Sequence, residues 1–221
     1  MNPRMLPAIA IFTVTAMVGT SASAAVIISP VSATASSTFS ATYDIGNTID
    51  RSGLFTPFVS GVDDFDLYVA TNPIHTLQAD NNEWFSASGV TSAQVTYDLG
   101  GVIGVDRLAL WNEEFSGFGT GRISISDDGV TFASLTSISP VDSPFVQDYG
   151  VQVFALGAIN TRYVRFDISG CPQPDGSTSL LCGIGEVAFS TAATAVPEPA
   201  SLALLGLAFA GLGFARRRKL H

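Results

Sequence analysis

The sequence predicts an all-β protein whose central domain is a β-sandwich. Short segments alternate apolar and polar residues with a period of two, and turn residues separate these segments. No segment of the body repeats apolar residues with the 3.6-residue period and the capping residues of a helix, so helices are expected to be minor. Many short strands joined by turns are typical of β-sandwiches. About 170 residues lie between two apolar chain ends, which is enough for one sizeable domain.

Four segments carry the strand pattern most clearly. Residues 94–100, QVTYDLG, place three apolar side chains on one face and polar side chains on the other. Residues 122–135 read as a hairpin, because the Asp-Asp-Gly at its centre tolerates the positive φ angles of a tight turn. Residues 162–168, RYVRFDI, alternate in the same way, and residues 185–190, GEVAFS, supply a late strand.

The N-terminus has the pattern of a secretory signal peptide. Arg4 precedes an apolar run over residues 6–18, and Ala22-Ser23-Ala24 is a small-x-small cleavage pattern. We expect cleavage after Ala24; the alternative is an uncleaved anchor.

The C-terminal tail contains an apolar segment that is marginal for crossing a membrane. Residues 200–215 carry no charge, and a helix of that length spans roughly 24 Å, less than the hydrocarbon core of about 30 Å. Local thinning and snorkelling of the basic residues 216–219 can meet the shortfall. The positive-inside rule keeps this basic cluster in the cytoplasm, so the body is predicted to be exported.

The tail also resembles a known sorting signal. Val196 is followed by Pro197, Glu198 and Pro199, then by the apolar segment and the arginine cluster. This order resembles the PEP-CTERM signal of Gram-negative bacteria that make extracellular polysaccharide. The resemblance implies a precursor tethered to the inner membrane through the tail, processing by an exosortase, and delivery to the cell surface or medium. The alternative is an ordinary single-span anchor.

The expected organisation has four parts. These are a signal peptide (residues 1–24), a β-sandwich domain (25–190), a linker (191–196) and a sorting signal (197–221) with its membrane segment at 200–215.

The body is strongly acidic. Ala25 to Pro199 contain 19 acids, five arginines and no lysine, a formal charge of about −14. Such a charge repels phosphates and argues against nucleic acid as a partner. It suits a surface protein or one that recruits cations.

The two cysteines are predicted to form a disulfide. Cys171 and Cys182 are close in sequence and lie in the exported part. The loop between them is rich in Pro, Gly and Ser, and closing it would stabilise the fold by roughly 3 kcal/mol on a chain-entropy argument.

Eight short motifs follow one another in an order that resembles the discoidin, or coagulation-factor type C, domain. They are ATASST, NTID, EWFSA, VTYDLGG, VDRLALW, ISISDDGVTF, TRYVRFDI and GIGEVAF. The resemblance spans about Ser32 to Ser190 and implies a galactose-binding-like jelly-roll β-sandwich. The segment between Asp50 and Trp84 departs from the pattern as a long insertion, and Trp84 matches a tryptophan that is buried in the family.

A carbohydrate-binding surface is expected around Trp111. If Leu108 and Leu110 face the core, Trp111 lies on the opposite face at the entry to the next loop. An aromatic face beside a few oriented polar groups is what sugar recognition uses. The candidate binding residues are Trp111, Asn112, Glu113, Phe115, Phe118 and Arg122. The alternative is that Trp111 packs beneath its own loop or a second sheet.

A structural calcium site is the second candidate. Asp50 lies in the stretch that supplies calcium ligands in many discoidin-like domains, and Glu186 matches a late acidic ligand there. Calcium takes six to eight oxygens, so backbone carbonyls and a side chain such as Asn47 would complete the shell. The alternative is two solvated surface acids.

No catalytic constellation is recognisable, so we predict a binding module and not an enzyme. The body holds one histidine, His75, which is expected to be a surface or packing residue. The neighbouring Glu113 and Glu114 could support glycoside hydrolysis only at a defined separation across a cleft. The predicted function is an exported binding module for extracellular polysaccharide or a surface glycan. The alternatives are a non-catalytic structural protein of the surface or biofilm and, less favoured, a glycan-active enzyme.

Overall fold

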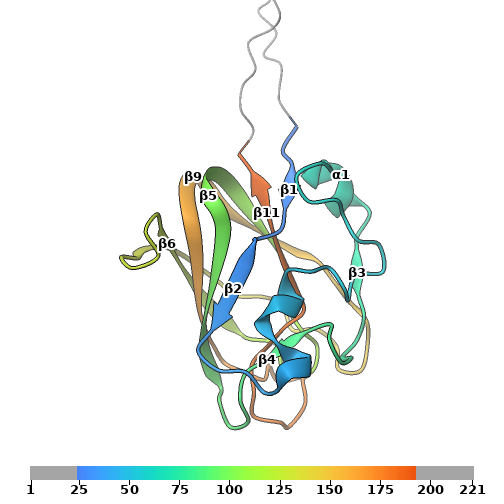
Figure 1. The fold of residues 1–221 in the computed structure, drawn as a ribbon. Helices are drawn as coiled ribbons and strands as arrows, with labels where there is room; N and C mark the ends of the chain where they lie inside the picture. Colours follow the sequence, from blue (N-terminus) through green and yellow to red (C-terminus); the bar gives the residue numbers. More distant parts are fainter. Residues whose placement is uncertain (1–23, 193–221) are drawn as a thin grey trace, which may run out of the picture. The chain divides into compact units, whose positions relative to one another are not determined.

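The computed structural model describes residues 24–192, which belong to one compact unit whose regular structure is mostly strands (Figure 1). The longer strands are β2 (Ser32–Ala35), β5 (Ser92–Trp111), β6 (Thr120–Ser126), β7 (Ala133–Ile138), β9 (Gln152–Ser169) and β11 (Glu186–Thr191). The short strands are β1 (Ile27–Ile28), β3 (Ile74–His75), β4 (Trp84–Phe85), β8 (Tyr149–Gly150) and β10 (Gly183–Ile184). The helices are α1 (Phe65–Ala70) and two 3-10 turns, η1 (Ala41–Tyr43) and η2 (Ile45–Thr48).

Two long strands, β5 and β9, pass through both layers of the sandwich. The N-terminal part of β5 pairs with β2 and with the C-terminal part of β9, which continues to β6 and β7. The C-terminal part of β5 pairs with β11, which pairs with β1, and with the start of β9. Register shifts between Asp98 and Ile103 and between Val105 and Arg107 interrupt the ladder where β5 passes from one layer to the other.

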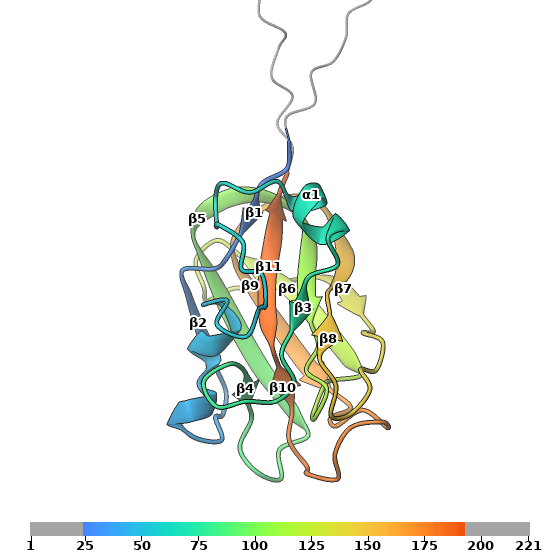
Figure 2. The ribbon, with the colours of Figure 1, turned by 90° about the vertical axis from the view of Figure 1, so that its right-hand side faces the viewer.

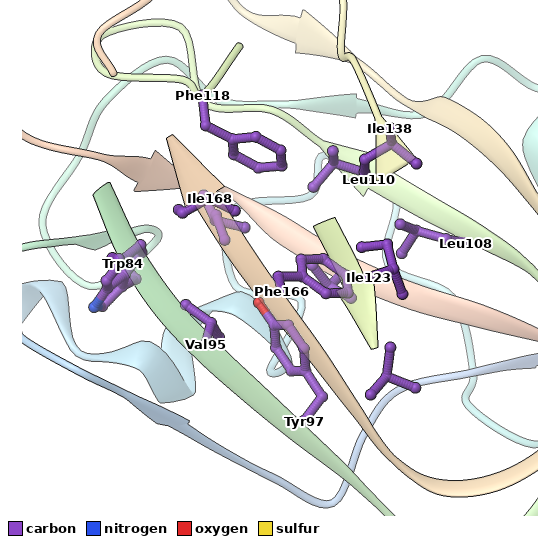
Figure 3. Packing of buried hydrophobic residues seen from close by; sticks show 14 of the residues in the cluster. Trp84, Val95, Tyr97, Leu108, Leu110, Phe118, Ile123, Ile138, Phe166 and Ile168 are labelled. Atoms are coloured by element: carbon purple, nitrogen blue, oxygen red, sulfur yellow. The ribbon is translucent and has the colours of Figure 1, made fainter. Parts of the chain in front are cut away.

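The main core fills the space between these layers (Figure 3). Tyr97 and Phe166 project from one layer and Phe189 from the other, and the ring of Tyr97 lies 5.2 Å from Phe166 and 6.5 Å from Phe189. Trp84 is fully buried in the same cluster, as predicted. The period-two pattern of residues 162–168 is confirmed, since Val164, Phe166 and Ile168 are all buried. The predicted hairpin is β6–β7, with Gly129 at a φ of +74° in its turn.

The insertion between Asp50 and Trp84 builds a second core on the outer face of the layer that contains β11 and the C-terminal part of β5 (Figure 2). It supplies Phe58 and the α1 residues Phe65 and Tyr68, and its strand β3 pairs with β8. Ala109, Trp111 and Ala188 of the sheet pack against these side chains. This layer is therefore buried on both faces.

Both ends of the domain leave from one end of the sandwich. Val26 donates its backbone N–H to the Thr191 hydroxyl, and Thr191 donates its N–H to the Val26 carbonyl, each at 2.9 Å. The loops around β4 lie at the opposite end (Figure 1). Within residues 24–192, no helix is long and apolar enough to cross a membrane. Residues 1–23 of the predicted signal peptide and the segment 200–215 lie outside the described residues.

Candidate functional site

A pocket opens at the end of the domain opposite the chain exits. Its volume is about 240 Å³. Four separate segments line it, namely Phe39 and Tyr43 around η1, then Gln78, Phe85 and Ser88, then Phe115, and finally Ser179, Leu180 and Leu181. The pocket thus collects side chains from most of the length of the domain.

Four of the nine lining residues are aromatic, and their rings form a contacting row that Phe145 continues beyond the pocket lining. Tyr43 lies 6.1 Å from Phe39 and 4.9 Å from Phe85, measured between ring centroids. Phe115 lies 5.9 Å from Phe85 and 5.6 Å from Phe145. Phe39 is 52% exposed and Phe145 42% exposed, so the two ends of the aromatic row reach solvent. Flat apolar rings that are open to solvent can stack against the apolar face of a sugar.

A small set of polar groups accompanies the rings. The Tyr43 hydroxyl donates to Asp80 Oδ1 at 2.7 Å and accepts from Gln78 Nε2 at 3.3 Å. Burial and the neighbouring Asp80 raise the pKa of Tyr43, so the hydroxyl keeps its proton. The hydroxyls of Ser88 and Ser179 complete the polar lining. These groups can orient a ligand through hydrogen bonds.

The disulfide holds the loop that forms one wall. Cys171 and Cys182 are bonded, which confirms the predicted pair. Cys182 donates its backbone N–H to the Ser86 hydroxyl at 2.8 Å, and Gly89 donates to the Leu180 carbonyl at 2.7 Å. The wall that carries Leu180 is therefore tied to the loop after β4.

Three buried glutamates hold the remaining walls from beneath. Glu114 accepts from the backbone N–H groups of Gln78 and Val146, at 3.1 and 2.8 Å. Glu83 accepts from Ala79, and Glu113 accepts from Phe115, at 3.0 and 2.9 Å. Burial raises the pKa of Glu83 to about 8 and that of Glu113 well above its usual range.

The structure corrects the expected exposure of most of the residues predicted around Trp111. Trp111 is fully buried because the insertion covers its face, and its Nε1 donates to the Pro73 carbonyl at 3.0 Å. This is the alternative in which Trp111 packs beneath a covering layer. Asn112, Glu113 and Phe118 are buried as well and bond to their own loop.

The two other predicted residues lie apart. Phe115 lines the pocket, whereas Arg122 lies on the outer face of β6 in a second hollow with Ser137 and Asp167. The sequence analysis missed four residues of the pocket, because they lie in separate segments that no sequence motif links. They are Phe39, Tyr43, Phe85 and Leu180.

The residues predicted for calcium are partly consistent with a cation site. Glu186 is fully buried; its Oε2 accepts from the Arg51 N–H at 2.9 Å, and its Oε1 has no hydrogen-bond partner. Burial is the main cause that raises the pKa of Glu186, and the charge of Asp50 acts in the same direction. The Asn47 amide nitrogen instead donates to the carbonyls of Thr42 and Glu83, both at 2.9 Å. No group of three His, Cys, Asp or Glu side chains arranged for a metal occurs within residues 24–192, so carbonyls or water would have to supply most ligands.

His75 is a packing residue, as expected. It is fully buried, stacks on Tyr149 with ring centroids 4.9 Å apart, and bonds through Nδ1 to the Thr76 carbonyl. Burial lowers the pKa of His75 to about 4, which keeps the ring neutral at physiological pH.

Comparison with known proteins finds matches to the tail and to the fold. The family model described as the PEP-CTERM protein-sorting motif matches residues 195–219. The C-terminal tail thus matches the sorting signal that its sequence resembles. No curated protein sequence matches the chain.

Among solved structures, a mutant of chitosan-binding module 1 from a chitosanase/glucanase of Paenibacillus sp. IK-5 superposes with a TM-score of 0.51 at 19% identity, covering 76% of this chain and 98% of that one. A CBM32 module from a family 31 glycoside hydrolase of Clostridium perfringens gives 0.49 at 14% identity, covering 75% and 91%. The domain has the discoidin-like, galactose-binding-like β-sandwich fold predicted from the sequence.

Proposed function

We propose that the domain is an exported module that binds carbohydrate in the pocket lined by Phe39, Tyr43, Phe85 and Phe115. The observation that carries the proposal is the row of contacting rings, open to solvent at both ends, beside the Tyr43, Gln78 and serine polar groups. Apolar stacking surfaces with a few oriented hydrogen-bonding groups are what a sugar ring needs. Binding of chitosan by the Paenibacillus module, which shares the fold, supports the same class of ligand.

The place of the pocket fits a surface role. The described chain ends lie at one end of the domain and the loops around β4 lie at the other (Figure 1). Pocket residues belong to these loops, so attachment through the chain ends would leave the pocket free for an extracellular glycan. We attribute the sorting of the precursor to an exosortase, on the strength of the PEP-CTERM motif at residues 195–219.

Binding is tested by screening residues 25–193 on an array of bacterial and plant glycans. We expect a restricted set of sugars to bind, and Phe39→Ala to lose them. An array with no signal at any protein concentration would refute carbohydrate binding and favour a structural surface protein.

Sorting is tested by mass spectrometry of the protein recovered from the surface of its native cell. If the tail is a temporary anchor, peptides containing residues 216–219 should be missing from the mature protein. Recovery of those residues in the mature pool would contradict processing and support a permanent anchor.

We also propose that a calcium ion bound by Asp50 and Glu186 stabilises the domain. The buried Glu186 oxygen that lacks a partner supports this assignment, since a cation would satisfy it. At free calcium about a hundredfold above the dissociation constant, one site adds roughly 2.7 kcal/mol. Thermal melts with calcium and with chelator should therefore differ for the wild type and not for Asp50→Ala. Identical wild-type melts in the two conditions would rule the site out.

A further inference from the structure

The pocket offers no positive charge to a ligand. Among the nine described residues that line it, none is Arg, Lys or His. The one lysine of the chain is Lys219, in the sorting tail. Three of the five arginines in the domain are engaged elsewhere: Arg107 pairs with Asp66, Arg162 pairs with Asp98 at 2.9 Å, and Arg165 lies 3.7 Å from Asp167.

The other two arginines do not supply this charge either. Arg51 donates from Nη1 to the Ser29 hydroxyl at 2.9 Å. Arg122 lies in the hollow on the outer face of β6. A carboxylate in the pocket would therefore have no cationic partner among the described residues that line it.

Several hydrogen-bond donors at the pocket are already engaged within the domain. The Tyr43 hydroxyl gives its proton to Asp80, and Gln78 gives one amide proton to Tyr43. The backbone N–H of Ser179 is already bonded to the Ser177 hydroxyl, and that of Gly89 to the Leu180 carbonyl. The serine hydroxyls and the second Gln78 proton are among the donors that remain, and these donors are uncharged.

The acidic groups nearest the pocket are Asp80, which accepts from Tyr43 at its edge, and Glu114, which lies beneath its walls. The whole body carries 19 acids against five arginines between Ala25 and Pro199. An acidic polysaccharide would be repelled at long range, and its carboxylate would lose water without gaining a charged partner.

We infer that the pocket selects sugars without acidic substituents, either neutral or amino sugars, and discriminates against uronate polymers. This inference rests on the proposed carbohydrate function and adds the class of sugar. An unpartnered carboxylate should weaken binding at least about tenfold relative to the corresponding neutral sugar.

The experiment titrates residues 25–193 with matched oligosaccharides: galactose or N-acetylglucosamine oligomers, glucosamine oligomers, and galacturonate or mannuronate oligomers. We expect a neutral or amino sugar to bind and the uronates to bind at least about tenfold more weakly. For a neutral sugar, the dissociation constant should change less than about twofold between low and high salt.

A charge-adding variant sharpens the test. Ser88→Lys places a cation in the pocket lining and should raise uronate affinity about three- to fivefold. Val130→Lys, at an exposed position of the β6–β7 turn, adds the same charge elsewhere and should not. If the wild type binds uronates as tightly as neutral sugars and Phe39→Ala loses this binding, the inference is overturned. The proposal of carbohydrate binding in the pocket would still stand. Failure of every sugar to bind would overturn both.

Discussion

Replacing Trp111 by alanine is expected to lower the free energy of unfolding by about 3–5 kcal/mol, because the change empties the centre of the second core. The side chain is completely buried against the insertion, and its Nε1 bond to the Pro73 carbonyl would be lost, leaving that oxygen without its partner. Chemical denaturation of residues 25–193 measures the effect.

A conservative change and an exposed change bracket this result. Trp111→Phe keeps most of the apolar contact and should cost less than alanine, whereas Leu67→Ala, at a position of α1 that is 73% exposed, should stay within about 0.5 kcal/mol of the wild type. If Trp111→Ala costs less than about 1 kcal/mol, the insertion does not bury this residue, and a surface role for Trp111 returns.

The domain should become less stable as pH rises from 6.5 to 8.5. Glu83 is fully buried, and burial raises its pKa from 4.5 to about 8. The folded protein therefore keeps a proton that the unfolded chain releases, so the free energy of unfolding falls with rising pH until about pH 8. For this group the free energy of unfolding falls by at most about 1.4 kcal/mol per pH unit. Over the whole range from pH 6.5 to 8.5, the midpoint of thermal unfolding should fall by roughly 4–8 °C. The raised pKa of Glu113 acts in the same direction.

The choice of pH window isolates the glutamates. The pKa of His75 is lowered to about 4, so this group makes the folded protein more stable as pH rises. That gain in stability is complete above the ordinary histidine pKa of 6.5. Glu83→Gln should flatten the pH dependence of thermal melts, while Asp127→Asn, an exposed change in the β6–β7 turn, should leave it unchanged. A midpoint that rises between pH 6.5 and 8.5 would contradict the assignment of a protonated Glu83.

The strands were predictable because their faces differ in polarity. In β9, Val164, Phe166 and Ile168 alternate with polar residues, so the period-two pattern identifies both the strand and its core face. The disulfide was predictable because only two cysteines occur and the loop between them is short.

The alternation of side chains along the strand does not by itself predict that Trp111 is buried. Leu108, Ala109, Leu110 and Trp111 are consecutive apolar residues, and Val187, Ala188 and Phe189 pair with this run in β11. A continuous apolar run indicates a strand that is buried on both faces, in contrast to an alternating strand with one solvated face. The insertion between Asp50 and Trp84 supplies the covering layer.

The pocket could not be found from sequence spacing. Phe39 and Leu180 are far apart in the chain, and they meet because the loops around β4 and the disulfide loop converge at one end of the sandwich. Binding residues often lie on loops held by a rigid scaffold, but the sequence does not show which loops meet.

The most direct test of the pocket as the binding site is calorimetric titration of a sugar identified on the array into two matched variants. Phe39→Ala removes a ring that lines the pocket and is 52% exposed, and Phe55→Ala removes a ring that is 63% exposed and does not line it. We expect Phe39→Ala to weaken binding at least about tenfold, because it removes a stacking surface, and Phe55→Ala to match the wild type. Equal affinities for the two variants, or a loss confined to Phe55→Ala, would show that sugar binds elsewhere on the domain.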